Sequence, residues 1–232
     1  LFELDEKVSK ARVFQRDETS YIMFYSSEGL LTYDYRPMAT LGVVCVMEKD
    51  GEIENDYSAR SVRQGFEFMT DDVVEELAQE AVKKTNFLFG AGKPKAGELP
   101  VVLGAGGSGI LLHEAMGHPF EADFNRKGES IFSDKMGKSI AKDFINIVED
   151  GTMENNRGAL NIDDEGNDVK KVYLVKDGVL ESYLHDRISA KHYGVEPTGN
   201  GRRQSFRHMP IPRMRITYME NGPHTTDDII SS

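Results

Sequence analysis

Leu41-Gly-Val-Val-Cys-Val-Met, followed by Lys49-Asp-Gly, is the stretch of sequence that decides the fold of the first part of the chain. Apolar and polar positions alternate around it, over residues 9 to 60, with the period of half-buried strands. Tyr21-Ile-Met-Phe-Tyr shows the same alternation, and Ser26-Ser-Glu-Gly and Lys49-Asp-Gly supply the interruptions that turns require. The pattern predicts an antiparallel meander.

A helix is predicted directly after the meander. Thr70 can cap its first turn, and Asp71 and Asp72 suit the positive end of a helix. Lys83-Lys lies near its close. The expected apolar face, which should pack on the sheet, consists of Val73, Val74, Leu77 and Ala81.

The glycine- and proline-rich segment at residues 90–100 predicts a linker. We therefore expect two domains, residues 1–92 and residues 93–232. Past the linker, Val101-Val-Leu predicts a short strand, and a helix is expected from about Ser108 through His118. A later hairpin is expected around Lys176-Asp-Gly, because an Asp-Gly pair accepts the positive dihedral angles of a tight turn.

The fold class follows from these elements. We predict an α+β protein with an antiparallel β-rich first part and its packing helix. A mixed α/β second part should carry the helix around His113 and His118.

Composition narrows the range of functions. The 232 residues include 39% hydrophobic positions, which suits a globular core, and the net charge of -11 disfavours nucleic acid and anionic membranes as partners. A single cysteine, Cys45, fits a reducing compartment, and it lies in an apolar strand where a buried thiol is expected rather than a ligand. No membrane span or signal peptide is apparent, so a cytoplasmic location is expected. The start at Leu1 suggests a fragment.

The glycines of Gly104-Ala-Gly-Gly-Ser-Gly match the spacing of a dinucleotide-binding turn. The match fails in its second half, because Pro119-Phe-Glu-Ala-Asp-Phe-Asn-Arg-Lys is not the apolar strand ending in an acid that such a site needs. No lysine followed by serine or threonine closes the run either. The glycines therefore predict a tight turn or a backbone that faces a neighbouring cleft.

His113-Glu-Ala-Met-Gly-His carries the strongest chemical signal in the sequence. Zinc prefers nitrogen and sulfur ligands, and imidazole supplies such a nitrogen. A catalytic zinc site also keeps one position open for water. His113 and His118 supply two such ligands. Glu114 is then placed to act as the general base.

The spacing of the two histidines differs from the usual zinc-peptidase motif, in which they lie four residues apart on a helix. Five residues at roughly 100° each would separate the rings of His113 and His118 by about 140° on a regular helix. We expect Gly117 and Pro119 to distort the helix, through an unusual glycine backbone angle and a non-helical His118, and so bring the rings together.

Three questions stay open at this level. The motif could instead comprise a core histidine at His113, a solvated Glu114 and a helix cap at His118. Arg202 and Arg203 could hold a peptide carboxylate or simply be solvated. A zinc site also needs a third ligand, and the candidates are Glu121, Asp123, His185, His192, His208 and His224.

Taken together, the motifs of this chain resemble the TldD/PmbA family over essentially all 232 residues. The resemblance rests on Leu111-Leu-His-Glu-Ala-Met-Gly-His, Glu121-Ala-Asp-Phe-Asn-Arg-Lys-Gly, Asp163-Asp-Glu-Gly, Gly194-Val-Glu-Pro-Thr-Gly-Asn-Gly-Arg-Arg and Pro210-Ile-Pro-Arg-Met.

The resemblance implies a cytoplasmic zinc metallopeptidase that cuts unfolded or leader peptides, either as a homodimer or paired with a TldE/PmbA-type chain that lacks the metal motif. It assigns zinc to His113 and His118, the base role to Glu114, and the third ligand to a cysteine beyond these 232 residues. It also leaves a non-catalytic alternative, a regulatory binding protein that modulates DNA gyrase.

Overall fold

The computed structural model describes all residues from Leu1 to Ser232. Contacts divide the chain into two compact units, each of which is described by itself. The domain boundary expected between residues 92 and 93 stays a prediction. The first unit comprises Leu1–Tyr21, Tyr35–Glu98 and Asn155–Arg157, and the second comprises Ile22–Asp34, Leu99–Glu154 and Gly158–Ser232.

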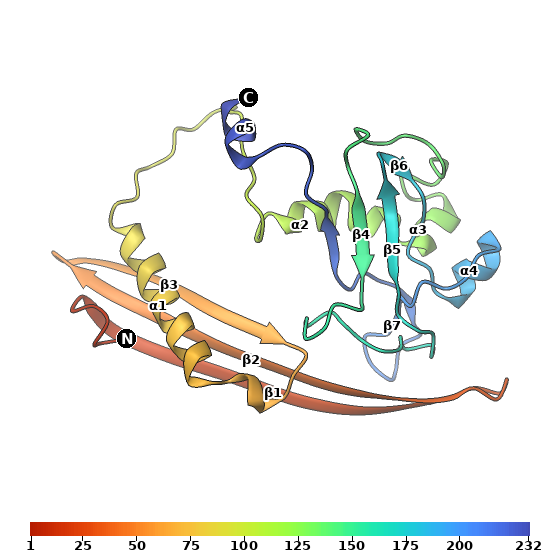
Figure 1. Cartoon of the computed structure of the whole chain (residues 1–232), viewed down its shortest axis with the longest axis horizontal. Coiled ribbons are helices and arrows are strands. Elements are labelled where there is room, and N and C mark those ends of the chain that lie inside the picture. Colours follow the sequence, from red (N-terminus) through yellow and green to blue (C-terminus); the bar gives the residue numbers. More distant parts are fainter. The chain divides into compact units, whose positions relative to one another are not determined.

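The expected meander is present and confirmed. Strands β1 (Val8–Tyr25), β2 (Leu31–Lys49) and β3 (Glu52–Val62) form a sheet in the order β1-β2-β3, and β2 pairs antiparallel with β3 (Figure 1). Asp50 and Gly51 join β2 to β3 with φ angles of 52° and 82°, as a two-residue hairpin turn requires.

The first core lies between this sheet and one long helix. After a short 3-10 turn η1 (Phe66–Phe68), helix α1 (Asp71–Leu88) begins at the predicted cap, where the Thr70 side chain accepts a hydrogen bond from the Val73 N–H. Val74 was expected on the buried face but is 45% exposed, because the buried stripe continues through Ala78 instead. The core contains Ala39, Leu41, Val43, Cys45, Met47, Leu77 and Ala81, among others.

The expected strand at residues 101–103 is wrong. Val101, Val102 and Leu103 belong to an irregular segment and are between 51% and 74% exposed. A strand is held by backbone hydrogen bonds to a neighbouring strand, and none pairs with this stretch.

A second sheet organises the other unit. Its strand order is β6-β5-β4-β9. The β5–β6 hairpin turns at Asp177 and Gly178, with φ angles of 48° and 76°, which confirms the expected Asp-Gly turn. The strands are β4 (Ile147–Asp150), β5 (Lys171–Lys176), β6 (Val179–Leu180) and β9 (Thr217–Met219), with a separate small pair β7 (Gly201–Arg202) and β8 (Ile211–Pro212).

Short helical segments pack around this sheet (Figure 1). They are α2 (Gly109–Leu112), η2 (His113–Gly117), η3 (His118–Phe120), α3 (Ala122–Lys127) and α4 (Arg187–Tyr193). A further helix, α5 (Thr226–Ser231), follows β9 and has no buried residue. Phe120 and Ala122 are fully buried in one core with Ile147 and Leu174, so the sheet fixes the end of the His113–His118 segment. The predicted α+β class is confirmed. None of the helices is both long and apolar enough to span a membrane.

Candidate metal centre

The segment that carries the motif is a distorted helix. Helix α2 ends at Leu112 and continues as the π-helical turn η2, in which the His118 N–H donates to the carbonyl of His113. A π turn accommodates one more residue than an α turn, so His118 returns to the side of the helix where His113 lies. The two ring centroids are 4.5 Å apart and the rings meet edge to face at 85°. The expected distortion is confirmed.

The causes of this helix distortion differ from those expected. Gly117 has ordinary helical angles, φ -58° and ψ -62°, and its importance is spatial, because a Cβ there would overlap the Sδ and Cε of Met214. His118 is also helical, with φ -60° and ψ -44°, so Pro119 does not exclude that geometry. Pro119 instead lacks the N–H that the next π hydrogen bond would need, and the chain tightens into η3.

The π turn brings the three motif residues into one group. Ligand atoms of His113, Glu114 and His118 all lie within 4.8 Å of one another, and this is the one group of three or more metal-ligating side chains in the chain. His113 and Glu114 are exposed and His118 is half-buried, so the group opens to solvent. Two imidazoles beside a carboxylate fit the ligand preferences of zinc and leave space for water or substrate.

Glu121, one of the candidate third ligands, lies behind His118. Its Oε1 is 3.1 Å from His118 Nδ1, and its Oε2 accepts a hydrogen bond of 2.8 Å from Nη1 of Arg213. The carboxylate has no exposed surface. Burial raises the pKa of Glu121, while the Arg213 charge and the His118 contact oppose that rise. Asp123, the other nearby candidate, lies 3.8 Å from Arg213.

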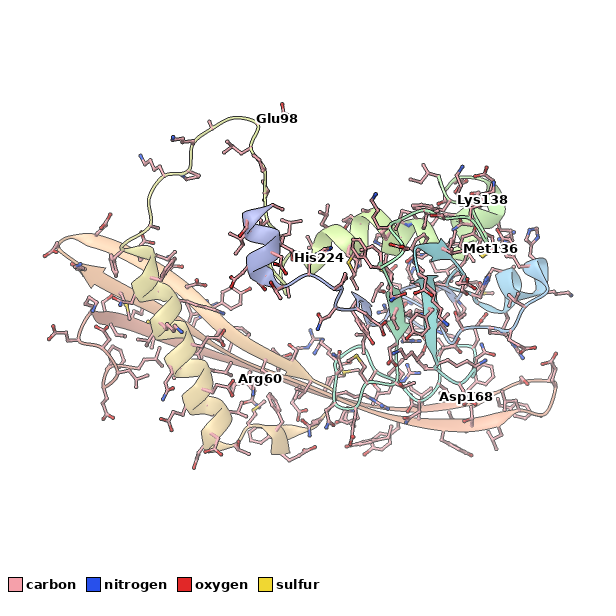
Figure 2. All side chains as sticks on the ribbon, turned by 45° about the horizontal axis from the view of Figure 1, so that its top comes forward. Arg60, Glu98, Met136, Lys138, Asp168 and His224 are labelled. Carbon is pink, nitrogen blue, oxygen red and sulfur yellow. The ribbon has the colours of Figure 1, made fainter.

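The more distant histidines do not join the group. His185 is buried, with Nδ1 3.3 Å from Ser189 Oγ, and burial lowers its pKa to about 4. His192 packs edge to face on Tyr193, and Nδ1 of His208 is 2.9 Å from Ser205 Oγ. His224, labelled in Figure 2, precedes α5 and packs against Phe144.

The remaining singled-out residues have local partners. Arg202 donates to the Met214 carbonyl, and Arg203 donates to the carbonyl of Asp164 at 2.7 Å, so both arginines support loops of the second unit. Cys45 is fully buried, as expected, and burial raises the pKa of its thiol.

Sequence reasoning missed the link from His118 through Glu121 to Arg213. The two charged residues are 92 positions apart, and no spacing rule connects them. The available signal was chemical, since an acid three residues after a ligating histidine can reach its ring on a helical turn.

Two family models match this chain. The PmbA/TldA metallopeptidase central domain matches residues 1–86, and the PmbA/TldA metallopeptidase C-terminal domain matches residues 96–232. The chain belongs to the PmbA/TldD metallopeptidase family. The resemblance noted in the sequence is thereby confirmed.

Curated members of the PmbA/TldD family are similar along nearly the whole chain. The metalloprotease TldD homologue of Haemophilus influenzae is 41% identical, covering 98% of this chain and 48% of the relative. The zinc metalloprotease TldD homologue of Saccharolobus solfataricus is 33% identical, covering 92% of this chain and 48% of the relative. The chain therefore spans about half the length of the curated relatives it matches.

Two solved structures share the fold at lower identity. A Thermotoga maritima protein described as a proposed modulator of a DNA gyrase superposes with a TM-score of 0.79 at 21% identity, over 97% of this chain and 50% of its own. TldE from Thermococcus kodakarensis superposes with a TM-score of 0.77 at 23% identity, over 99% of this chain and 51% of its own length.

Proposed function

We propose that this protein is the metal-bearing subunit of a zinc-dependent metallopeptidase that hydrolyses unfolded or leader peptides in the cytoplasm. The observation that carries the proposal is the π turn, which gathers ligand atoms of His113, Glu114 and His118 within 4.8 Å. The relatives' names, metalloprotease and in one case zinc metalloprotease, support the same reaction class.

The three motif residues would have different roles in hydrolysis. His113 and His118 would hold the metal through ring nitrogens. Zinc, when bound, supplies Lewis-acid polarisation of a carbonyl and lowers the pKa of water to about 7. The Glu114 carboxylate takes the proton from the attacking water and passes it to the departing amine nitrogen. Glu114 is exposed beside both imidazoles, which leaves room for an extended peptide.

The zinc shell would be completed from outside this group. A catalytic zinc usually has three protein ligands, and the structure gathers two histidines. We propose a cysteine outside these 232 residues as the third ligand, as the family resemblance implies, so zinc binding and cleavage are to be measured on the full-length protein.

Substitution of Glu114 tests the base role. Glu114→Gln keeps the size of the side chain but cannot take a proton, so cleavage of an unfolded peptide by full-length protein should fall about 10²- to 10⁴-fold. Zinc content should persist. Exposed Glu129→Gln is the matched control and should retain cleavage. Undiminished cleavage by Glu114→Gln contradicts the assignment.

Metal analysis tests the cofactor. Full-length protein purified without chelator should contain zinc, lose cleavage on chelation and regain it when zinc is added. His113→Ala should lose both the metal and cleavage. If the full-length protein holds no transition metal and added zinc restores no cleavage, the result would favour the regulatory binding alternative.

The partner is proposed on the similarity to TldE. We infer that a related TldE/PmbA-type chain or a second copy of this chain completes the enzyme. Co-expression followed by size-exclusion chromatography checks this. Cleavage by a purified monomer at the same rate as by the co-expressed sample would contradict the need for a partner.

A further inference from the structure

We propose that Glu121 is a positioning residue that fixes the tautomer and orientation of His118, with Arg213 holding its carboxylate in place. The inference rests on the proposed zinc function. It assigns Glu121 a role distinct from that of a ligand, and it accounts for an ion pair between a buried carboxylate and the half-buried Arg213 directly behind the metal motif.

The tautomer follows from hydrogen-bond chemistry. A neutral imidazole has one N–H donor and one acceptor nitrogen, and an ionised carboxylate only accepts. Oε1 of Glu121 lies 3.1 Å from His118 Nδ1, and Oε2 accepts from the Arg213 guanidinium at 2.8 Å, which favours the ionised carboxylate. The shared proton therefore belongs on Nδ1, and Nε2 keeps the lone pair that a metal needs.

The backbone around Glu121 is anchored, so its carboxylate has a fixed position. The Ala122 N–H donates to the Leu184 carbonyl at 3.0 Å, and the Leu184 N–H donates to the Phe120 carbonyl at 2.9 Å. Phe120 and Ala122 are fully buried on either side. The side-chain amide of Asn125 adds a hydrogen bond of 2.9 Å to the Glu121 carbonyl.

Glu121 differs from the proposed metal ligands in its burial. The Glu121 side chain has no exposed surface, whereas 41% of the His118 side chain is exposed, so the two meet with the carboxylate on the inner side of the ring. Glu121 is also outside the group of ligand atoms within 4.8 Å. A purely structural ion pair with Arg213 is the competing explanation.

Glu121→Gln separates these explanations. In this variant the amide oxygen should turn to Arg213, since a guanidinium only donates, and the NH₂ should then face His118 Nδ1. That arrangement favours the proton on Nε2, the nitrogen that the metal requires. Zinc affinity should fall about 10- to 100-fold, as measured by competition with a chromophoric chelator in the full-length protein.

Two further variants make the comparison specific. Exposed Glu129→Gln removes a charge at a residue with no part in the His118–Glu121–Arg213 contacts, and its zinc affinity should stay within about twofold of wild type. Adding Arg213→Met to Glu121→Gln frees the amide to turn its oxygen toward Nδ1 and should recover part of the affinity. A structural ion pair predicts a further loss instead. Zinc affinity within about threefold of wild type in a folded Glu121→Gln variant overturns the proposal.

A second measurement needs no substitution. Nitrogen-15 NMR of metal-free full-length wild type, in mildly alkaline solution, should show His118 protonated on Nδ1. A ring protonated on Nε2 overturns the proposal even if Glu121→Gln does not fold. Wild-type protein that binds no zinc overturns the proposed function as well, whereas zinc binding by wild type with unaltered binding by Glu121→Gln rejects only the role of Glu121.

Discussion

At the scale of single residues, a methyl group added at Gly117 should disturb the motif. The new Cβ would overlap the sulfur and terminal methyl of Met214, the flexible end of a buried side chain, so Met214 must shift and Gly117→Ala should lower the free energy of unfolding by about 1 kcal/mol. Met214→Ala is itself destabilising, because Met214 is buried, but it makes room, so Gly117→Ala should cost less in the Met214→Ala background than in wild type. Gly109→Ala is the control, because a Cβ there meets nothing within 4 Å. Chemical denaturation of the variants measures the effect, and equal stability of Gly117→Ala and wild type contradicts it.

A second residue-scale prediction concerns pH. Burial, together with Asp163 and Asp186, raises the pKa of Glu165 from 4.5 to about 7, against the lowering effect of the Arg187 N–H. Between these two pH values the folded state holds a proton that the unfolded state has released. Stability therefore falls as pH rises from about 4.5 to about 7, and this carboxyl causes no further change above about 7. Burial lowers the pKa of His185 from 6.5 to about 4, so this histidine lowers stability as pH falls between these two values, where only the unfolded state binds the proton.

Glu165→Gln isolates the first of these effects. The amide oxygen can still accept from the Arg187 N–H, and no charge appears at alkaline pH. The variant should be more stable than wild type by roughly 1–2 kcal/mol at about pH 8 and nearly equal at about pH 5, by urea unfolding. Exposed Glu181→Gln controls for the loss of a charge. An equal difference at both pH values would contradict the assigned pKa.

Prediction from sequence worked at this scale where the chemistry was local. His113, Glu114 and His118 could be proposed because they are neighbours in the chain, and the structure places their ligand atoms together. Glu121 could be seen only as a possible ligand, since its contact with Arg213 depends on how the chain folds back. The space requirement at Gly117 is likewise set by Met214, far away in sequence.

At the scale of elements, the two Asp-Gly turns form a matched pair. Gly51 and Gly178 have φ angles of 82° and 76°, so alanine at either position should cost about 1–2 kcal/mol in backbone strain. A Cβ at Gly51 meets nothing within 4 Å, whereas one at Gly178 would lie 2.6 Å from the carbonyl oxygens of Ala141 and Lys142. Gly178→Ala should therefore be the more destabilising by about 1–3 kcal/mol in thermal or chemical unfolding. Equal losses would contradict this.

The same scale shows which elements a sequence can reveal. The cap at Thr70 and both Asp-Gly turns were predictable, because each depends on residues within a few positions. Val101-Val-Leu has the composition of a strand but lies irregular and exposed, because pairing depends on a partner that composition does not disclose.

At the scale of the whole molecule, each unit has its own hydrophobic core, and the metal motif packs in only one of them. Leu77 belongs to the first core and is 1% exposed, so Leu77→Ala should cost about 2–5 kcal/mol of stability. Zinc affinity should be unaffected. Leu174→Ala, in the core that contains Phe120, should reduce both stability and zinc affinity. Chelator competition and unfolding of the two variants check this, and equal losses of zinc affinity would contradict it.

The π turn bears on how the motif tolerates a change in chain length. Deletion of the exposed Ala115 would leave His-Glu-Met-Gly-His, in which the two histidines lie four positions apart. An ordinary α-helical hydrogen bond would then replace the longer one, and both imidazoles would still occupy one side of the helix. A π turn absorbs its extra residue locally, so Phe120 could keep its place in the core. The five-residue and four-residue spacings are thus one deletion apart and present the same pair of nitrogens.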